Sequence, residues 1–267
     1  MAVYITGDTH GEFRRFNIKS FYEQKMLSKS DYMIICGDFG GLWGQKSLIQ
    51  LQNDILGDRS YTTLFVDGNH ENYDLLKTFP ITEWHGGKVQ YITDTIIHLM
   101  RGQVYDIDGN TYFTMGGAAS HDIEDGILEP DDVMFRTKKH RLDRRGAMYR
   151  INHISWWREE MPNDEEYAEG IRNLEKHNYE VDYIISHCAP TSIQELVSKK
   201  VHTSDALNEY LESIKIKTKF KKWFFGHYHD DREISDNFML MYKEIYDMQN
   251  STLLNKYIIK AKKECST

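Results

Sequence analysis

Side chains that commonly bind metal ions follow several short apolar segments of this 267-residue sequence. Four of the five segments stop at or near a glycine, and after every segment the next residues supply aspartate, asparagine or histidine. In chain order these candidates are Asp8, His10, Asp38, Asn69, His70, His187, His227 and His229. Oxygen and nitrogen donors without a cysteine thiolate suit Mn²⁺, Fe or Zn²⁺ better than Ca²⁺ or a structural zinc site. The residue types therefore predict a metal centre that is assembled from distant parts of the chain.

The number of these side chains points to two ions. Without His70, seven of these candidates remain as ligands. Seven ligands are too many for one ion and suffice for two if one carboxylate bridges the pair. Two divalent cations outweigh the negative charge of Asp8, Asp38 and a bridging hydroxide, so the centre would hold a phosphate and lower the pKa of the shared water. His70 is not needed as a ligand, and from the same cavity it would donate a proton to a leaving alkoxide.

The apolar segments in front of the candidate ligands have the length and composition of buried β-strands. Their ranges are Val3–Thr6, Tyr32–Cys36, Thr63–Val66, Val181–Ser186 and Trp223–Phe225. Helix-length segments such as Lys46–Leu56 lie between the first three, an alternation that is typical of an α/β fold. Loops at the carboxyl ends of such strands converge on one crevice, which would bring the candidate ligands together.

Further elements are expected along the rest of the chain. A meander of antiparallel strands, expected to join a second sheet, covers Ile96–Met100, Val104–Ile107 and Tyr112–Met115. A hairpin turn is expected at Asp108-Gly109-Asn110. Helices with N-terminal caps are expected at Asp164–His177 after Asn163 and at Ser204–Lys215 with Ser204 as the cap. The lysine-rich Lys256–Thr267 predicts a last strand with a frayed tail.

The stretch 120–157 lacks this strand pattern, and we expect it to be a lid or an inserted helical excursion. It opens acidic and then becomes basic, so the two runs would pair with each other as a solvated face. The alternative is a phosphate-binding role for the basic run, with Arg144 and Arg145 as candidates. His121 opens the stretch after a glycine pair and is a further candidate for substrate contact.

The composition bounds the class of protein. A net charge of −8, from 33 Lys and Arg against 41 Asp and Glu, excludes a strongly basic nucleic-acid coat. Three cysteines cannot form a disulfide framework, and their odd number fits a reducing compartment. The sequence shows neither a leader pattern at its start nor an apolar run long enough to span a membrane. We expect a soluble, cytoplasmic protein with one domain over residues 1–267.

Five short motifs resemble those of the calcineurin-like metallophosphoesterases. They are GDTHG at 7–11, GDFGG at 37–41, GNHE at 68–71, SH at 186–187 and GHYH at 226–229, in the order of that family. The resemblance implies a four-layered αββα sandwich with a dinuclear metal site at the rim of its sheets. The implied ligands are Asp8, His10 and His229 for one ion, Asn69, His187 and His227 for the second, and Asp38 as the bridge. His70 would be the acid or the stabiliser of the transition state.

The sequence departs from the protein phosphatases and dinucleoside tetraphosphatases that share this resemblance. Their second motif continues to Asp- or Asn-Arg-Gly, whereas this chain reads GDFGGLW. They also place an arginine before GNHE, where this chain has Asp67. Both arginines that bind the substrate phosphate in that branch are thus missing, which argues against protein-phosphatase activity.

The expected activity is hydrolysis of a phosphomonoester or phosphodiester by a hydroxide that bridges two divalent ions, with Mn²⁺ as the first choice and His70 assisting. The expected partner is a phosphorylated small molecule or a nucleotide. A nuclease of the same superfamily is the alternative, although only residues 136–150 offer a basic track. A metal-binding scaffold without catalysis is the third, but scaffolds lose ligand histidines and none is lost here. The residues leave the exact substrate and the oligomeric state open.

Overall fold

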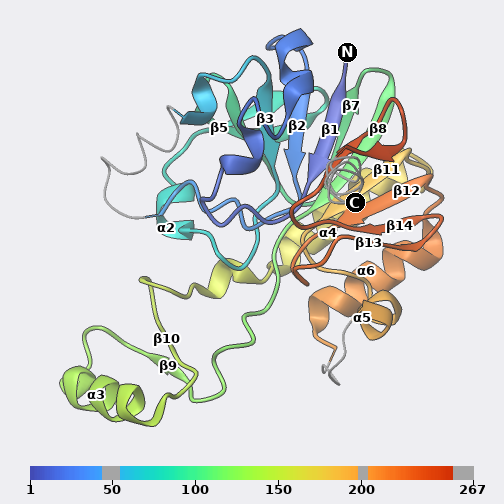
Figure 1. Cartoon of the computed structure of the whole chain (residues 1–267). Coiled ribbons are helices and arrows are strands. Elements are labelled where there is room, and N and C mark those ends of the chain that lie inside the picture. The colour runs from blue at the N-terminus through green and yellow to red at the C-terminus, as the bar shows by residue number, and fades with distance from the viewer. Residues whose placement is uncertain (44–54, 198–203, 255–267) are drawn as a thin grey trace, which may run out of the picture.

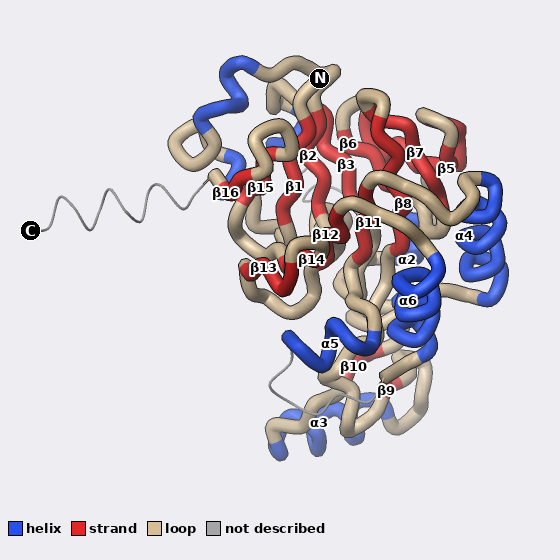
Figure 2. Tube along the Cα trace, turned by 90° about the vertical axis from the view of Figure 1, so that its right-hand side faces the viewer, coloured by secondary structure: helices blue, strands red, loops and turns tan. Residues whose placement is uncertain are grey.

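The computed structural model of the chain describes residues 1–43, 55–197 and 204–254, which form two large mixed β-sheets (Figure 1, Figure 2). In spatial order the strands of the first sheet are β16 (Thr252–Leu253), β15 (Ile245–Asp247), β1 (Val3–Thr6), β2 (Tyr32–Ile35), β3 (Thr62–Phe65), β6 (Ile96–Leu99), β5 (Gly87–Thr93) and β4 (Ile81–Trp84). The pairs β1–β2, β2–β3 and β3–β6 are parallel, and the outer pairs are antiparallel. The centre of this sheet is therefore of the parallel type that an α/β pattern predicts.

The second sheet has parallel strands in its centre and an antiparallel hairpin at one edge. In spatial order its strands are β13 (Arg232–Ser235), β14 (Phe238–Leu240), β12 (Lys222–Phe225), β11 (Tyr183–Ser186), β8 (Asn110–Met115) and β7 (Gln103–Ile107). β11 is parallel to both of its neighbours, β8 and β12. The β7–β8 turn contains Asp108 and Gly109 with φ of 55° and 73°, the left-handed conformation that a two-residue hairpin turn favours. The expected hairpin turn is therefore present.

Three apolar clusters separate four layers. The middle cluster fills the space between the sheets, where Ile34 and Leu64 of the first share a core with Ile185 and Phe224 of the second. Another covers the outer face of the first sheet, under the short helices η1 (Arg14–Phe16), η2 (Tyr22–Met26) and α2 (Tyr73–Leu76). The last lies between the second sheet and the helices α4 (Asp164–Lys176), α5 (Thr191–Val197) and α6 (Ala206–Lys217). This is the expected αββα sandwich.

The strands expected in front of the candidate ligands are present as β1, β2, β3, β11 and β12. The expected meander is only partly correct, because β6 joins the first sheet, parallel to β3, and only β7 and β8 enter the second. β6 is buried on both faces, with Ile97 in the middle core and Ile96 in the outer one. Such burial suits a strand beside β3 better than a strand in a meander.

The two helices expected after residue 160 are present, with one change of cap. Asn163 caps α4 through a capping box, as expected. Asp205 caps α6 in place of Ser204, because its side chain accepts the backbone N–H of the third helical residue. The expected helix Lys46–Leu56 lies largely, and the expected strand Lys256–Thr267 entirely, outside the described residues. In the described ranges no helix is long and apolar enough to cross a membrane.

Residues 120–157 form an arm that projects from the sandwich (Figure 1, lower left). The arm contains two short parallel strands and one helix, which are β9 (Ile127–Leu128), β10 (Arg150–Ile151) and α3 (Phe135–Arg145). Its acidic and basic runs pair in part: Arg145 lies 2.7 Å from Asp125, and Arg150 lies 2.6 Å from Asp122. The arm is thus a hairpin-like excursion whose base, rather than its tip, adjoins the sandwich.

Candidate metal centre

The candidate ligands meet at one edge of the sandwich, where parallel strands of both sheets end. The loops after β1, β2 and β3 come from the first sheet, and the loops after β11 and β12 come from the second. The backbone N–H of His227 donates to both carboxylate oxygens of Asp8 at 3.0 Å, and the N–H of Gly226 donates to the carbonyl of His187 at 3.1 Å. The two sheets are therefore joined through the candidate site itself.

One cluster consists of Asp8, His10, Asp38 and His229. Each offers one ligand atom, and these atoms all lie within 4.8 Å of one another. The Nε2 atoms of His10 and His229 are 3.0 Å apart, and Oδ2 of Asp8 is 3.2 Å from Nε2 of His229. The carboxylates are buried and the histidines reach the surface. This mixed set of oxygen and nitrogen donors fits a divalent transition-metal ion.

A second group, Asn69, His187 and His227, lies on the other side of Asp38. Oδ1 of Asn69 is 3.3 Å from Nε2 of His187, and the rings of His187 and His227 are 5.0 Å apart. Oδ1 of Asp38 lies 3.3 Å from Nε2 of His187, whereas its Oδ2 lies 3.6 Å from Nε2 of His10. One carboxylate therefore faces both groups, one oxygen to each.

Hydrogen bonds to neighbouring groups set the orientation of two candidate ligands. Nδ1 of His187 donates to the carbonyl of Cys36 at 2.8 Å, which directs its Nε2 toward the centre. Nδ2 of Asn69 donates to Oγ of Ser120 at 3.3 Å, so its Oδ1 faces His187. Ser120 in turn donates to Glu160 at 2.7 Å. The first residue of the arm, and through it Glu160 just after the arm, thus support the side chain of Asn69.

Several candidate ligands have left-handed backbone conformations that non-glycine residues rarely adopt. The φ angles are 46° at His10, 46° at Asp38, 69° at His227 and 51° at His229. His227 and His229 would point to opposite sides of an extended strand. Because β12 ends before them and both turn through positive φ, their side chains reach the same centre. Such local strain is common where side chains must meet at a functional site.

Motif glycines permit the close packing of these loops. A Cβ on Gly37, whose φ is +92°, would lie 2.2 Å from Nδ1 of His187. A Cβ on Gly68 would lie 2.1 Å from Oδ1 of Asp38. Glu71, which ends the third motif, is fully buried and accepts the backbone N–H of Phe39 at 2.6 Å. Glu71 is not among the residues expected from the sequence, and its carboxylate joins the second and third motif loops.

The charges of the centre are strongly coupled. Burial alone would raise the pKa of the Asp38 carboxyl, but the facing imidazoles, first that of His187, hold it well below its usual range. Burial opposes a charge on His187, yet the carboxylates of Asp38 and Asp8 raise the pKa of its imidazole above its ordinary value. Burial and then the charge of His187 lower the pKa of His227. The buried acidic pair therefore attracts positive charge, from a protonated imidazole or from a metal cation.

His70 lies beside the cluster on the wall of a cavity of about 170 Å³. Its backbone N–H donates to Oδ1 of Asp38 at 2.8 Å, and its ring centroid is 5.1 Å from that of His10. Burial lowers the pKa of its imidazole; Asp38 counteracts this, and the positive charge of Arg150 adds to the lowering. His70 thus adjoins the candidate ligands without being one of the four clustered residues.

The arm also contributes to this cavity. His121, a substrate contact expected from the sequence, lines it, together with Asp122 and Arg150, which had not been singled out. Arg144 and Arg145 are not among the lining residues, because α3 lies farther out along the arm. The alternation of acidic and basic runs was the only signal for Arg150, since it implies that the stretch folds back on itself.

The residue in front of the third motif has a structural partner in this chain. Asp67 is buried, accepts a hydrogen bond from Nε of Arg101 at 2.8 Å and lies 3.1 Å from Nε2 of His98. Arg101 lines a different cavity, of about 880 Å³, and not that of the candidate ligands. Asp67 and Arg101 therefore support the loop that carries Asn69 from the side away from the candidate ligands.

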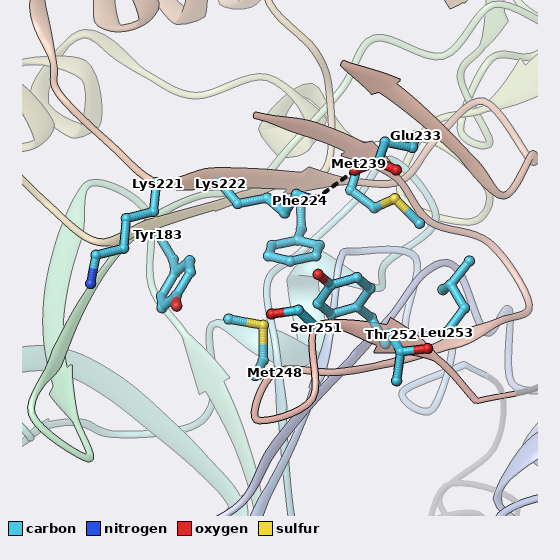
Figure 3. A pocket seen from close by; sticks show the side chains of 11 residues that line it. Tyr183, Lys221, Lys222, Phe224, Glu233, Met239, Met248, Ser251, Thr252 and Leu253 are labelled. Atoms are coloured by element: carbon cyan, nitrogen blue, oxygen red, sulfur yellow. Dashed lines mark hydrogen bonds and ion pairs between the residues drawn. The ribbon is translucent and has the colours of Figure 1, made fainter. Parts of the chain in front are cut away.

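Another cavity, of about 520 Å³, lies between the sheets at the opposite ends of β11 and β12 (Figure 3). Aromatic rings of Tyr183, Phe224 and Tyr246 line it. Lys221 and Lys222 at its rim form ion pairs with neighbouring carboxylates. In the part of the chain that the structure describes, no candidate metal ligand lines this cavity.

Two mixed sheets in four layers, with an Asp and His cluster at the strand ends, define the fold of a metallophosphoesterase. The profile of the calcineurin-like phosphoesterases matches residues 1–231, and the chain belongs to that family. A search of curated proteins found no match. Family membership and the cluster together support metal-dependent hydrolysis of phosphoesters as the general activity, in a family that uses dinuclear metal centres and acts on phosphorylated substrates.

Proposed function

We propose that this chain hydrolyses a phosphoester of a small molecule or a nucleotide at a centre of two divalent ions. The observation that carries the proposal is the position of Asp38, whose two carboxylate oxygens face different groups of ligands at 3.3 and 3.6 Å. A hydrolytic site with two ions requires a ligand set that is divided in this way.

In this proposal the ligands of one ion are Asp8, His10 and His229, those of the other are Asn69, His187 and His227, and Asp38 is shared. Mn²⁺ is the expected metal, and Fe or Zn²⁺ would accept the same donors. When bound, such ions act as Lewis acids on phosphoryl oxygens and make water a nucleophile near neutral pH. The chain itself orients the donors, through Cys36 for His187 and through Ser120 for Asn69.

His70 is the proposed catalytic residue of the protein. It lines the cavity beside Asp38 but stands outside the four-residue cluster. From this position its imidazole donates a proton to the leaving oxygen of the substrate or a hydrogen bond to the phosphoryl oxygens. The two roles predict different losses of rate on removal of His70: proton donation matters most for poor leaving groups, whereas a hydrogen bond to the phosphoryl oxygens matters similarly for all of them.

A nuclease is the second candidate, and its basic track would have to be the run 136–150. Much of that run is paired within the arm: the ion pairs are Lys138–Asp132, Lys139–Asp143, Arg145–Asp125 and Arg150–Asp122. This pairing reduces the positive field that a nucleic acid would meet, and it favours a small substrate. A scaffold without catalysis is disfavoured because every expected ligand is retained.

The proposed setting is the cytoplasm. Cys36 and Cys188 are free and buried, which fits a reducing compartment. Burial raises the pKa of both thiols, so they remain protonated and unreactive near neutral pH.

The test is a panel of substrates with the Mn²⁺-loaded protein. The panel contains p-nitrophenyl phosphate, bis-p-nitrophenyl phosphate, cyclic nucleotides, and short DNA and RNA. We expect turnover of a small phosphoester that stops on chelation and that Asp38→Asn abolishes. Cleavage of DNA or RNA alone, with steep salt dependence of binding, would favour the nuclease. No turnover of any substrate at two ions per chain would favour the scaffold.

A further inference from the structure

The cavity at the candidate centre has walls from two parts of the chain. The loops of the sandwich supply candidate ligands and His70, and the arm supplies His121, Asp122 and Arg150. Among the described residues that line this cavity, Arg150 is the one arginine or lysine. The cavity is only about 170 Å³, so a group bound at the candidate ligands would lie within reach of the arm.

The guanidinium of Arg150 is held in place without using all of its donors. Nε donates to both carboxylate oxygens of Asp122 at 2.8 Å, Nη2 lies 2.6 Å from Oδ2, and Nη1 donates to the carbonyl of Ser155 at 3.1 Å. An arginine has five N–H donors, so among the described residues one hydrogen on each terminal nitrogen is left over. Guanidinium N–H groups of this kind donate strong, charge-assisted hydrogen bonds to a phosphate oxygen.

The backbone of the arm fixes where Arg150 stands. Arg150 is in register with Ile127 in the β9–β10 pair, and its N–H donates to the carbonyl of Gly126 at 3.3 Å. The next N–H, of Ile151, donates to Oγ of Ser155 at 2.9 Å. The side chain is only 16% exposed. Arg150 therefore belongs to a built wall of the cavity and not to a mobile surface.

We propose that Arg150 binds the phosphoryl group of the substrate, that Asp122 positions it, and that the substrate is a phosphomonoester. The inference rests on the proposed function and names its substrate class. A monoester phosphate has three non-bridging oxygens and nearly two negative charges at neutral pH, whereas a diester has two such oxygens and one charge. If two oxygens are taken up at the metal centre, only the monoester keeps one for Arg150.

The experiment compares Arg150→Ala and Arg150→Lys with the Mn²⁺-loaded wild type. A charge-assisted pair contributes about 1.5–3 kcal/mol, so Arg150→Ala should raise the KM for p-nitrophenyl phosphate and the Kd for inorganic phosphate about 10- to 100-fold. The KM for bis-p-nitrophenyl phosphate should change by less than about threefold. Arg150→Lys keeps the charge but loses the planar guanidinium donors, so its KM and Kd should lie between those of the wild type and those of Arg150→Ala. Arg141→Ala, an exposed arginine on α3, is the matched control and should leave every constant unchanged.

Each outcome decides the inference. An unchanged Kd for phosphate in a folded Arg150→Ala protein with full metal content would show that Arg150 does not bind phosphate and has only a structural role in the arm. Equal losses on monoester and diester would overturn the substrate class. A raised KM in Arg144→Ala/Arg145→Ala but not in Arg150→Ala would place the phosphate contact on α3 instead. Phosphate binding that depends on Arg150 in a protein without any turnover would count against the proposed function and not against this contact.

Discussion

Asp38 is a buried carboxylate surrounded by imidazoles of the candidate centre. Its side chain is 1% exposed, it accepts the N–H of His70 at 2.8 Å, and it faces imidazoles on both sides. A buried carboxylate is unfavourable unless positive charge lies beside it. Its two oxygens lie 3.3 Å from Nε2 of His187 and 3.6 Å from Nε2 of His10, so each ion of the proposed two-ion centre would depend on it.

Asp38→Ala should therefore bind neither ion. Removing one shared ligand weakens both halves of the ligand set, and it also relieves the charge that draws cations into the centre. Metal analysis of the purified variant after incubation with Mn²⁺ measures this directly. Asp125→Ala, an exposed aspartate of the arm, is the matched control and should retain two ions. Two ions per chain in Asp38→Ala would exclude Asp38 as the bridge.

His70→Ala should keep both ions and the fold but lose about two to four orders of magnitude in kcat, as expected for removal of a general acid. The side chain of His70 lines the cavity and is not one of the clustered donors. Steady-state kinetics together with metal analysis and circular dichroism provides the measurement. Loss of an ion in this variant would contradict the assignment of His70 as a non-ligand.

The leaving group separates the two roles proposed for His70. If the imidazole gives a proton to the leaving oxygen, the loss should be largest with alkyl phosphates and should shrink with p-nitrophenyl phosphate, whose phenolate needs little protonation. If the imidazole stabilises the phosphoryl oxygens, the loss should be of similar size for both. The ratio of the two losses therefore reports the role.

At the scale of elements, the arm and the metal centre are connected through its base. Ser120 at the start of the arm accepts a hydrogen bond from Asn69 and donates one to Glu160, just after its end. Glu160 is 1% exposed, and burial raises the pKa of its carboxyl to about 8. The other oxygen of this carboxyl, Oε1, has no hydrogen-bond partner among the described residues. The junction therefore favours a neutral carboxyl.

Replacing Glu160 by glutamine should change how stability depends on pH. The folded pKa of about 8 lies above the ordinary value of 4.5, so the stabilisation from the neutral carboxyl is complete below pH 4.5 and is lost as pH rises toward 8. Relative to wild type, Glu160→Gln should gain up to about 1.4 kcal/mol per pH unit across this window. Urea unfolding of both proteins at several pH values measures the difference. Parallel curves would show that Glu160 is ionised in the folded protein.

At the scale of the whole molecule, the residues that converge on the candidate centre could be predicted because their signal is local. Each follows a short buried strand, and the motif glycines mark the points where backbone and ligand must pack closely, as Gly37 does beside His187. The cap of α4 was predictable for the same reason, since Asn163 makes bonds only within its own turn. Local chemistry of this kind is readable without knowledge of the fold.

The features that were missed depend on contacts between distant parts of the chain. The position of β6 follows from two cores that its faces share, and no periodicity within Ile96–Leu99 identifies its sheet. Arg150 is one of several cations in a single run, and only its pairing with Asp122, 28 residues earlier, brings it to the cavity. Ser204 and Asp205 are both good caps, so the sequence could not choose between them.

The candidate metal centre also joins the two halves of the sandwich. Asp8, His10, Asp38 and Asn69 follow strands of the first sheet, whereas His187, His227 and His229 follow strands of the second. An ion that binds ligands from both sheets binds only the folded chain. Its binding free energy therefore adds to the stability of the fold.

Removal of the ions should consequently lower the melting temperature of the whole protein. An ion at 100 times its Kd stabilises the fold by about 2.7 kcal/mol. For a chain of this size that corresponds to roughly 5–10 °C in Tm. Scanning calorimetry of the chelated protein, with and without added Mn²⁺, measures the shift. Asp38→Ala should show no response to Mn²⁺, and Arg141→Ala should show the full response. If the wild type melts at the same temperature in both states while metal analysis shows two bound ions, the ions bind the unfolded chain as tightly as the folded one, and the centre does not stabilise the fold.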